Sequence, residues 1–231
     1  MKKNSIDINA SLADLMTGVL FLFIIALIAY MLNFNDKHSQ ENKLQSQLKD
    51  TNYLTSNLIN NLSKLLDRND ISHTANVKAG SISFDSQSLA FESGGWELNT
   101  EQLERLESIQ LALELLIPCY AKEPPSQSFF SFCKSYMSGK LEAIIIEGHT
   151  DNTPIRNKSF DNIDLSYRRA KSIYSELVSE QLMNLKNNKN HSLFSVLGAG
   201  DTNPINFYET PTADIKNRRI ELRFVMEKPW I

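Results

Sequence analysis

Asp14 stands at the start of an uncharged apolar run, Leu15 to Leu32. Of all residues in the chain, it is the one whose sequence context most clearly indicates a chemical role. As a helix this run would span roughly 27 Å at 1.5 Å per residue, close to the ~30 Å hydrocarbon core of a bilayer. A titratable carboxylate at a membrane face is costly unless protein or water shields it, and it can cycle between charged and neutral forms. Asp14 is therefore a candidate functional residue. The alternative is that it caps the helix or marks its polar edge.

Asp151 and Arg169 are a second pair of residues whose types could do chemistry. Asp151 follows a predicted buried strand, and Arg169 lies in the first turns of a predicted helix. A fixed carboxylate can accept hydrogen bonds from an ammonium group, and a planar guanidinium can bind a carboxylate through two hydrogen bonds. A structural ion pair beneath a loop is the alternative, and these two residues alone favour it. We expect the nearby His149 to form structural hydrogen bonds rather than to act in catalysis.

Four stretches of the chain must position these residues. Lys2 and Lys3 precede the apolar run, and the positive-inside rule keeps such a segment in the cytoplasm. A cleaved signal peptide is the alternative, but its apolar region should be only about 7–15 residues long. The predicted stretches are a cytoplasmic N-terminal segment (1–11), a single transmembrane helix (12–32), a linker (33–76) and a soluble domain on the far side of the membrane (77–231).

The linker shows a heptad-like spacing that favours a parallel, dimeric coiled coil. An amphipathic helix lying on its own domain is the alternative. The residues at the a and d positions are Leu44, Leu48, Thr51, Thr55, Leu58, Leu62 and Leu65.

The soluble domain alternates strand and helix patterns, which predicts an α+β fold with a mixed β-sheet and helices packed on one side. Asn99 and Gln102 form a predicted capping box at the start of the first helix. The predicted strands are 77–84, 141–146, 194–197 and 219–225, and the predicted helices begin after Asn99 and at Leu165, the second running to about Met183.

Composition and cysteine count exclude several classes of function. The 231 residues carry a formal net charge of −3, which gives no electrostatic basis for nucleic-acid binding. The sequence has no glycine-rich phosphate loop and no Ser-His-Asp arrangement, so neither an enzyme nor a bound cofactor is indicated. Cys119 and Cys133 could form a disulfide or remain two thiols, and no metal site is expected around them.

Four sequence blocks, in this order, carry a family resemblance: Ile146 to Pro154, Asp164 to Ala170, Gly198 to Pro204 and Asn217 to Ile220. They resemble the motifs of the OmpA-like peptidoglycan-binding domain. The resemblance implies that the domain binds the diaminopimelate of a peptidoglycan stem peptide. By motif, the ligand anchors are Asp151 and Arg169, and the residues of the wall are Thr150, Leu165, Ser166, Asn217 and Arg218.

The segment Ala13 to Gly18 resembles MotB-type stator subunits, in which an aspartate carries ions through a rotary motor. This implies that Asp14 carries H⁺ or Na⁺ in a bacterial inner membrane, with two copies of this chain inside a ring of five MotA-like multi-span subunits. The segments Ser11 to Thr17, Cys119 to Ala121 and Arg218 to Arg223 look most like the B subunit of Zorya-type anti-phage motors. A passive peptidoglycan tether without ion transport is the alternative.

Overall fold

The computed structural model describes residues 8–86, 88–89, 91–92, 94–123, 133–155 and 159–227. The chain divides into two compact units, one of Met1–Lys49 with Pro229–Ile231 and one of Asp50–Lys228. Of the expected cytoplasmic segment 1–11, residues 1–7 lie outside the described residues.

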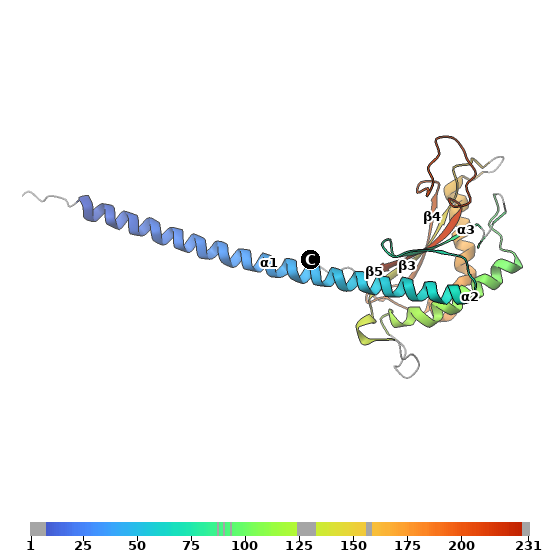
Figure 1. The fold of residues 1–231 in the computed structure, drawn as a ribbon, viewed down its shortest axis with the longest axis horizontal. Coiled ribbons are helices and arrows are strands. Elements are labelled where there is room, and N and C mark those ends of the chain that lie inside the picture. The colour runs from blue at the N-terminus through green and yellow to red at the C-terminus, as the bar shows by residue number, and fades with distance from the viewer. Residues whose placement is uncertain are drawn as a thin grey trace, which may run out of the picture. The chain divides into compact units, whose positions relative to one another are not determined.

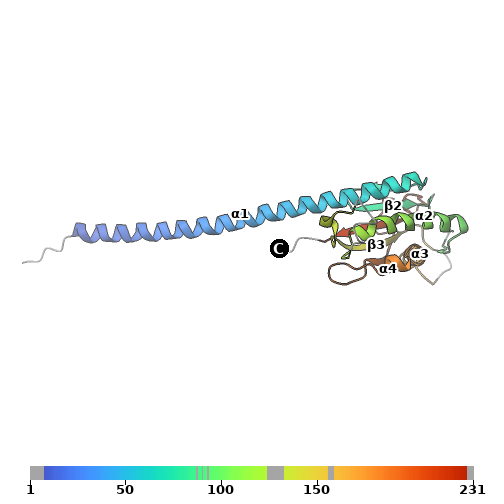
Figure 2. The ribbon, with the colours of Figure 1, turned by 90° about the horizontal axis from the view of Figure 1, so that it is seen from below.

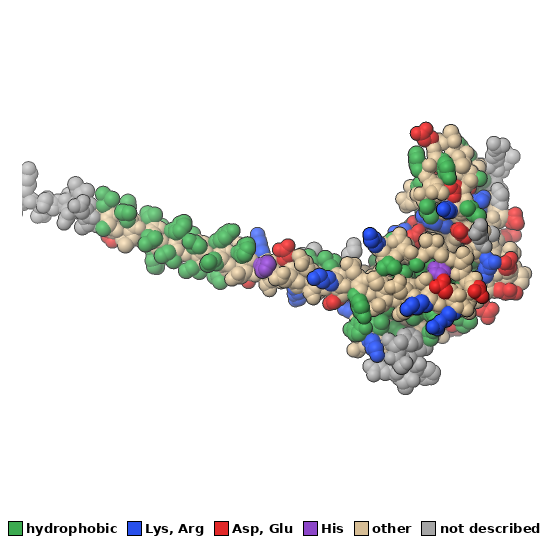
Figure 3. Space-filling view, in the orientation of Figure 1, with side chains coloured by type: hydrophobic (Ala, Val, Ile, Leu, Met, Phe, Trp, Pro, Cys, Tyr) green, Lys and Arg blue, Asp and Glu red, His purple; other side chains and the backbone are tan. Residues whose placement is uncertain are grey.

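The first unit consists of the N-terminal part of α1 (Ile8–Arg68). Among the described helices, α1 is the one long and apolar enough to cross a membrane, by length and composition. Its large apolar side chains between Leu12 and Leu32 are exposed, as the green surface in Figure 3 shows. The helix begins before Asp14, so this residue is not the N-cap, and the capping alternative is wrong. Thr17, one turn on, donates its hydroxyl to the main-chain oxygens of Ala13 and Asp14.

A five-stranded sheet in the order β1-β2-β5-β3-β4 forms the second unit (Figure 1). Neighbouring strands are antiparallel except β3 and β4, which are parallel and therefore need a crossover. Helix α3 (Asn162–Leu177) supplies that crossover. The predicted α+β fold with a mixed sheet is confirmed. The strands are β1 (Thr74–Asn76), β2 (Ser81–Asp85), β3 (Leu141–His149), β4 (Phe194–Gly200) and β5 (Arg219–Met226).

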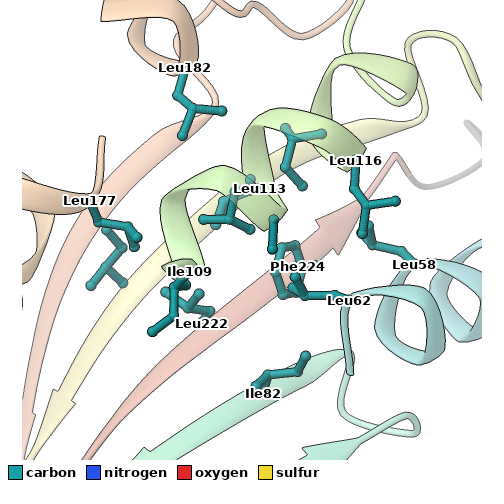
Figure 4. Close-up of a cluster of buried hydrophobic side chains, with 14 of the residues drawn as sticks. Leu58, Leu62, Ile82, Ile109, Leu113, Leu116, Leu177, Leu182, Leu222 and Phe224 are labelled. Carbon is teal, nitrogen blue, oxygen red and sulfur yellow. The ribbon is translucent and has the colours of Figure 1, made fainter. Parts of the chain in front are cut away.

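Alternation along β5 separates an apolar face of the sheet from a charged one. The apolar face is buried, with Ile220, Leu222 and Phe224 almost inaccessible to solvent. Helices α1, α2 (Thr100–Leu116), α3 and α4 (Glu180–Met183), whose ribbons are drawn in Figure 2, all contribute side chains to the core on this face (Figure 4). The opposite face carries Arg219, Glu221 and Arg223, so the polar residues of this strand do not interrupt the core.

The C-terminal part of α1, from Leu54 to Leu66, belongs to this core. The coiled-coil prediction is therefore wrong for this part of the linker. Leu58 and Leu62 are fully buried and lie against α2 and β5 in Figure 4. A side chain already packed in its own domain cannot also form a seam with a second chain. The compact unit consequently begins at Asp50, rather than at residue 77 as we expected. The N-terminal half of the seam differs, since Leu48 is 46% exposed, and pairing there stays a prediction.

Two predicted elements differ in the structure. The strand expected at 77–84 begins only at Ser81, as β2, because residues 77–80 form the turn that joins β1 to β2, and this turn ends on Gly80 with a φ of +67°. The helix expected from Leu165 to Met183 is interrupted by extended backbone at Val178, and Ser179 then caps α4 by accepting a hydrogen bond from Leu182 N.

The ends of α2 are defined by local interactions. Asn99 and Gln102 form the predicted capping box, each side chain accepting a main-chain N–H of the other residue. After α2, the 3₁₀ helices η1 (Ile117–Cys119) and η2 (Ser135–Met137) flank a disulfide between Cys119 and Cys133. The structure thereby decides between the bridge and the two thiols.

We expect Leu58→Ala to lower the free energy of unfolding of the second unit by about 2–5 kcal/mol, because it leaves a cavity in the core. Leu48→Ala on the same helix is the matched control and should change this free energy by less than about 0.5 kcal/mol. Denaturant titration followed by tryptophan fluorescence measures both. Equal effects of the two substitutions would contradict the placement of Leu58 in the core.

Candidate functional site

Two glycines allow α3 to approach the parallel strands closely. A Cβ atom on Gly148 would lie 2.1 Å from the main-chain oxygen of Ser166, and one on Gly198 would lie 2.7 Å from another main-chain oxygen of α3. Real Cβ atoms do not come so near to backbone, so any side chain at Gly148 would push α3 away. The close packing brings Leu165 and Arg169 of α3 beside the end of β3.

A cavity of about 390 Å³, which we name the charged cavity, opens where β3 ends. All the predicted binding residues line it except Ser166 and Asn217. Its walls combine groups of both charge signs with apolar and hydroxyl groups, which suits a zwitterionic ligand. The lining residues are Gly94, Thr150, Asp151, Thr153, Pro154, Ile155, Leu165, Arg169, Ala213 and Arg218.

Asp151 is buried, and its carboxylate is held in a fixed position. Oδ1 accepts a hydrogen bond from Thr153 N at 3.1 Å, and Oδ2 accepts one from Asp214 N at 3.4 Å. Arg218 Nε lies 3.6 Å from Oδ2, and the Arg218 side chain is 39% exposed. The ion-pair partner of Asp151 is therefore Arg218, whose side chain is partly exposed, and not Arg169 as the structural alternative required.

Arg169 is buried and is held by the loop that precedes α2. Its Nε donates to Gly95 O at 2.9 Å and its Nη2 donates to Glu92 O at 3.1 Å, while the guanidinium lies 5.2 Å from the ring centre of Phe91. Burial, and then the positive charge of Arg218, lower its pKa to about 10, so it remains charged at neutral pH. Because two main-chain oxygens occupy one edge of the guanidinium, a ligand carboxylate must approach the other edge.

An aromatic and cationic contact that we did not predict joins this loop to α3. Arg168 lies 4.7 Å from the ring centre of Trp96 and 5.3 Å from that of Phe160, and the two rings meet edge to face at 5.6 Å. Such contacts contribute roughly 0.5–1 kcal/mol each at exposed sites. They connect the loops on both sides of the charged cavity. The adjacent arginines Arg168 and Arg169 were the sequence signal for this second contact, because neighbouring residues of a helix point in different directions and so reach different partners.

Ser166 and Asn217, expected as ligand-contacting residues, brace the structure around the site instead. Ser166 Oγ accepts a hydrogen bond from Gly200 N at 2.9 Å and so ties α3 to the end of β4. Asn217 Oδ1 accepts from Ile205 N and Asn206 N at 2.8 and 3.0 Å. Both side chains are almost fully buried because their polar groups are used within the protein.

Asp214 organises the loop between β4 and β5 through several hydrogen bonds. Its carboxylate accepts from Asn206 Nδ2 at 2.8 Å and from the Tyr208 hydroxyl at 2.7 Å, and also from Lys216 N at 2.7 Å and Asn217 N at 3.3 Å. The two side-chain hydrogen bonds are the main reason why its pKa is lowered from 3.8 to about 2. No sequence pattern predicts this role, because the partners come from different turns of the loop.

The charged face of the sheet gathers a buried ionic cluster next to the site. His149 Nε2 lies 3.2 Å from Glu147 Oε1 and 3.8 Å from Glu221 Oε2. Arg223 Nη2 contacts both glutamates at 2.9 and 3.3 Å, and Arg219 Nε lies 3.5 Å from Glu221. The contacts of Glu147 with His149 and Arg223 lower the pKa of Glu147. His149 is buried beside these charged groups, but neither of its ring nitrogens makes a hydrogen bond to a described residue, so the hydrogen-bonding role that we expected stays a prediction.

The charged cavity lies almost wholly in a part of the chain that matches a known protein family. Residues 123–218, which contain all the lining residues except Gly94, match the model of the OmpA family. Over 80 residues the chain is 38% identical to Motility protein B of Bacillus subtilis (strain 168). This segment covers 34% of this chain and 28% of that protein's length.

A solved structure shares this architecture. A putative MotB-like protein from Desulfovibrio vulgaris matches 78% of this chain and 98% of its own at 17% identity, with a TM-score of 0.52, and shares the fold. The periplasmic domain of Helicobacter pylori MotB (residues 78-256) matches 64% of this chain and 76% of its own at 21% identity, with a TM-score of 0.42. The chain is similar to Motility protein B over part of its length, and its residues 123–218 match the OmpA family.

The loop between β4 and β5 should loosen as the pH falls. Because the pKa of Asp214 is lowered from 3.8 to about 2 in the fold, its stabilising contribution is complete above about 3.8 and is lost as the pH falls through about 2. The protection factors of the Ile205 and Asn206 amides, which are the intrinsic exchange rates divided by the observed ones, should fall over this range. Asp214→Asn should show fast exchange already at neutral pH, whereas Glu209→Gln, on the same loop, should behave as wild type. Identical pH profiles for all three proteins would contradict this role.

Proposed function

We propose that the charged cavity binds the diaminopimelate of a peptidoglycan stem peptide and that the protein anchors a membrane complex to the cell wall. The observation that carries this proposal is the convergence of Asp151, Arg169 and Arg218 on one cavity. Diaminopimelate presents an ammonium beside a carboxylate, so it offers one partner to each sign of charge. The similarity to Motility protein B supports the same reading, although it covers a minor part of that protein.

Ligand binding would exchange one ion pair for two. The ligand's ammonium approaches Asp151 and competes with Arg218, whose Nε lies at 3.6 Å, longer than a hydrogen bond. Arg218 is partly exposed and can turn towards the ligand's carboxylate, beside the free edge of Arg169. The buried carboxylate of Asp151 has a positively charged partner throughout this exchange, first Arg218 and then the ligand's ammonium group. It is therefore never left unpaired, which would be costly.

Asp151→Asn and Arg169→Ala should each abolish most retention of the protein on purified sacculi. Removing one member of a buried charge pair with the ligand costs on the order of 2–5 kcal/mol, a loss of more than about thirtyfold in affinity. Lys171→Ala, an exposed position of α3, is the matched control and should bind as wild type. Equal retention of all three variants would mean that the wall contact lies elsewhere.

The second part of the proposal concerns the membrane. Asp14 lies within α1, at the N-terminal edge of its apolar segment, with exposed apolar side chains following on all turns to Leu32. We assign to it the transport of H⁺ or Na⁺ in a complex with a MotA-like multi-span subunit, two copies of this chain standing inside a ring of five. The domain would lie in the periplasm, where the wall contact supplies resistance to the torque. An anti-phage motor of the Zorya type is the narrower form of this proposal.

Asp14→Asn should abolish activity in the cell while expression, membrane insertion and assembly remain intact, because Asn keeps the shape but cannot change charge. Asp36→Asn, an exposed carboxylate further along α1, is the control and should be fully active. Activity is measured as phage protection or motility, according to the neighbouring genes. Full activity of Asp14→Asn would leave the passive tether as the better account.

A further inference from the structure

The disulfide between Cys119 and Cys133 joins two segments of the second unit that differ in how firmly they are held. Cys119 lies in η1 and is 1% exposed, and its neighbours Ile117 and Tyr120 are equally well buried in the core. Cys133 is only partly buried, and the three residues after it, 134–136, are exposed. The disulfide therefore ties an exposed segment to a fixed one.

The exposed segment reaches α1 through Tyr136. The hydroxyl groups of Tyr136 and Tyr53 are hydrogen-bonded to each other. The chain that contains η2, drawn yellow-green, lies beside α1 in both Figure 1 and Figure 2. Tyr120 lies close to both tyrosines: burial is the main cause that raises its pKa to about 12, and the two neighbouring hydroxyl groups add to the effect. The residues next to the disulfide thus meet α1 at Tyr53.

Tyr53 stands where α1 joins the domain. The second unit begins at Asp50, and Leu54 is the first α1 side chain that belongs to its core. Leu58, one turn later, is fully inaccessible to solvent. Opening at the end of an attached helix breaks fewer buried contacts than opening further along it, so the end opens at the lower cost in free energy. The contact between Tyr53 and Tyr136 holds this end.

The exposure of the two cysteines determines the course of thiol–disulfide exchange with a dithiol. A thiolate of the dithiol can reach Sγ of Cys133 more easily than the buried Sγ of Cys119. Its attack forms a mixed disulfide with Cys133, and Cys119 leaves as a thiolate and takes up a proton. The second thiolate of the dithiol then displaces Cys133, which also takes up a proton. The dithiol is oxidised by two electrons to a disulfide, and the protein is reduced to two thiols.

We propose that this disulfide is a redox-sensitive switch, reduced by a dithiol at Cys133, and that its reduction detaches residues 50–55 of α1 from the domain. In the oxidised protein the disulfide holds Tyr136 against Tyr53. After reduction the buried Met137 still anchors the segment on one side, but the covalent tie on the other side is gone. Tyr136 then becomes less ordered, and its contact with Tyr53 weakens. The switch does not require wall binding, since it acts within the second unit. Its opening lengthens the free part of α1 between the apolar segment and the domain.

Amide hydrogen exchange of the full-length protein in detergent, read by mass spectrometry, tests the switch. The protein is measured in its oxidised form and in an excess of dithiothreitol. We expect the protection of residues 50–55 to fall about tenfold on reduction, while that of residues 58–66 in the same helix changes by less than about twofold. Reoxidation with glutathione disulfide should restore the original protection.

Three variants show whether the effect passes through Tyr136. The double variant Cys119→Ala/Cys133→Ala should match the reduced protein whether dithiothreitol is present or not. Tyr136→Ala should lose the protection of residues 50–55 although its disulfide is intact. Ser135→Ala, the exposed neighbour in the same segment, is the matched control and should respond to dithiothreitol as wild type does.

The measurement on wild type decides the matter even where the double variant does not fold. Unchanged protection of residues 50–55 on reduction would overturn the switch. An equal fall in residues 58–66 would also overturn it, because the disulfide would then stabilise the domain as a whole. A loss that reoxidation does not reverse, or a Tyr136→Ala protein with the full protection of oxidised wild type, would overturn it as well.

Discussion

The close contact of α3 with the parallel pair β3 and β4 is the constraint on which the rest of the site depends. Gly148 and Gly198 remove the side chains that would separate the layers, and Ser166 then bonds to Gly200 N across the junction. With α3 at this distance, Leu165 and Arg169 come beside Asp151 at the end of β3. A larger separation would move Arg169 away from the carboxylate, and the charged cavity would lose one of the two arginines that line it.

The charged cavity also requires that charged side chains be buried. Each of these buried charged groups has fixed partners in the protein. Arg169 donates to two main-chain oxygens, and Asp151 accepts from two main-chain N–H groups and lies near Arg218. These contacts offset the desolvation that burial imposes. Since the partners of Arg169 and Asp151 are mostly backbone, the two side chains hold their places without pairing to each other. Their charges thus stay available to a ligand.

The role of α1 changes along its length for a physical reason that the sequence pattern only partly shows. Its N-terminal part is apolar on all sides, as a lipid-facing helix must be, whereas its last turns are apolar on one side. That side, which includes Leu58 and Leu62, is part of the domain core. The helix therefore could not detach from the domain there without exposing core side chains to water. The heptad-like spacing was compatible with both a coiled coil and this packing, because each needs one apolar stripe.

The sequence by itself determined the apolar segment, the capping box of α2 and the α+β class. These follow from local rules: a run of apolar residues, a side chain three residues from its partner, and a strand that alternates at every second position. Five of the ten residues that line the charged cavity were predicted from the resemblance of their motifs to the OmpA-like domain. Tertiary structure alone decided that Arg218 pairs with Asp151, that Ser166 and Asn217 serve as braces, and that Leu58 packs inward. It also decided the arrangement of Trp96, Phe160 and Arg168. Each of these depends on distances between segments far apart in the chain, and such distances are set only when the layers pack.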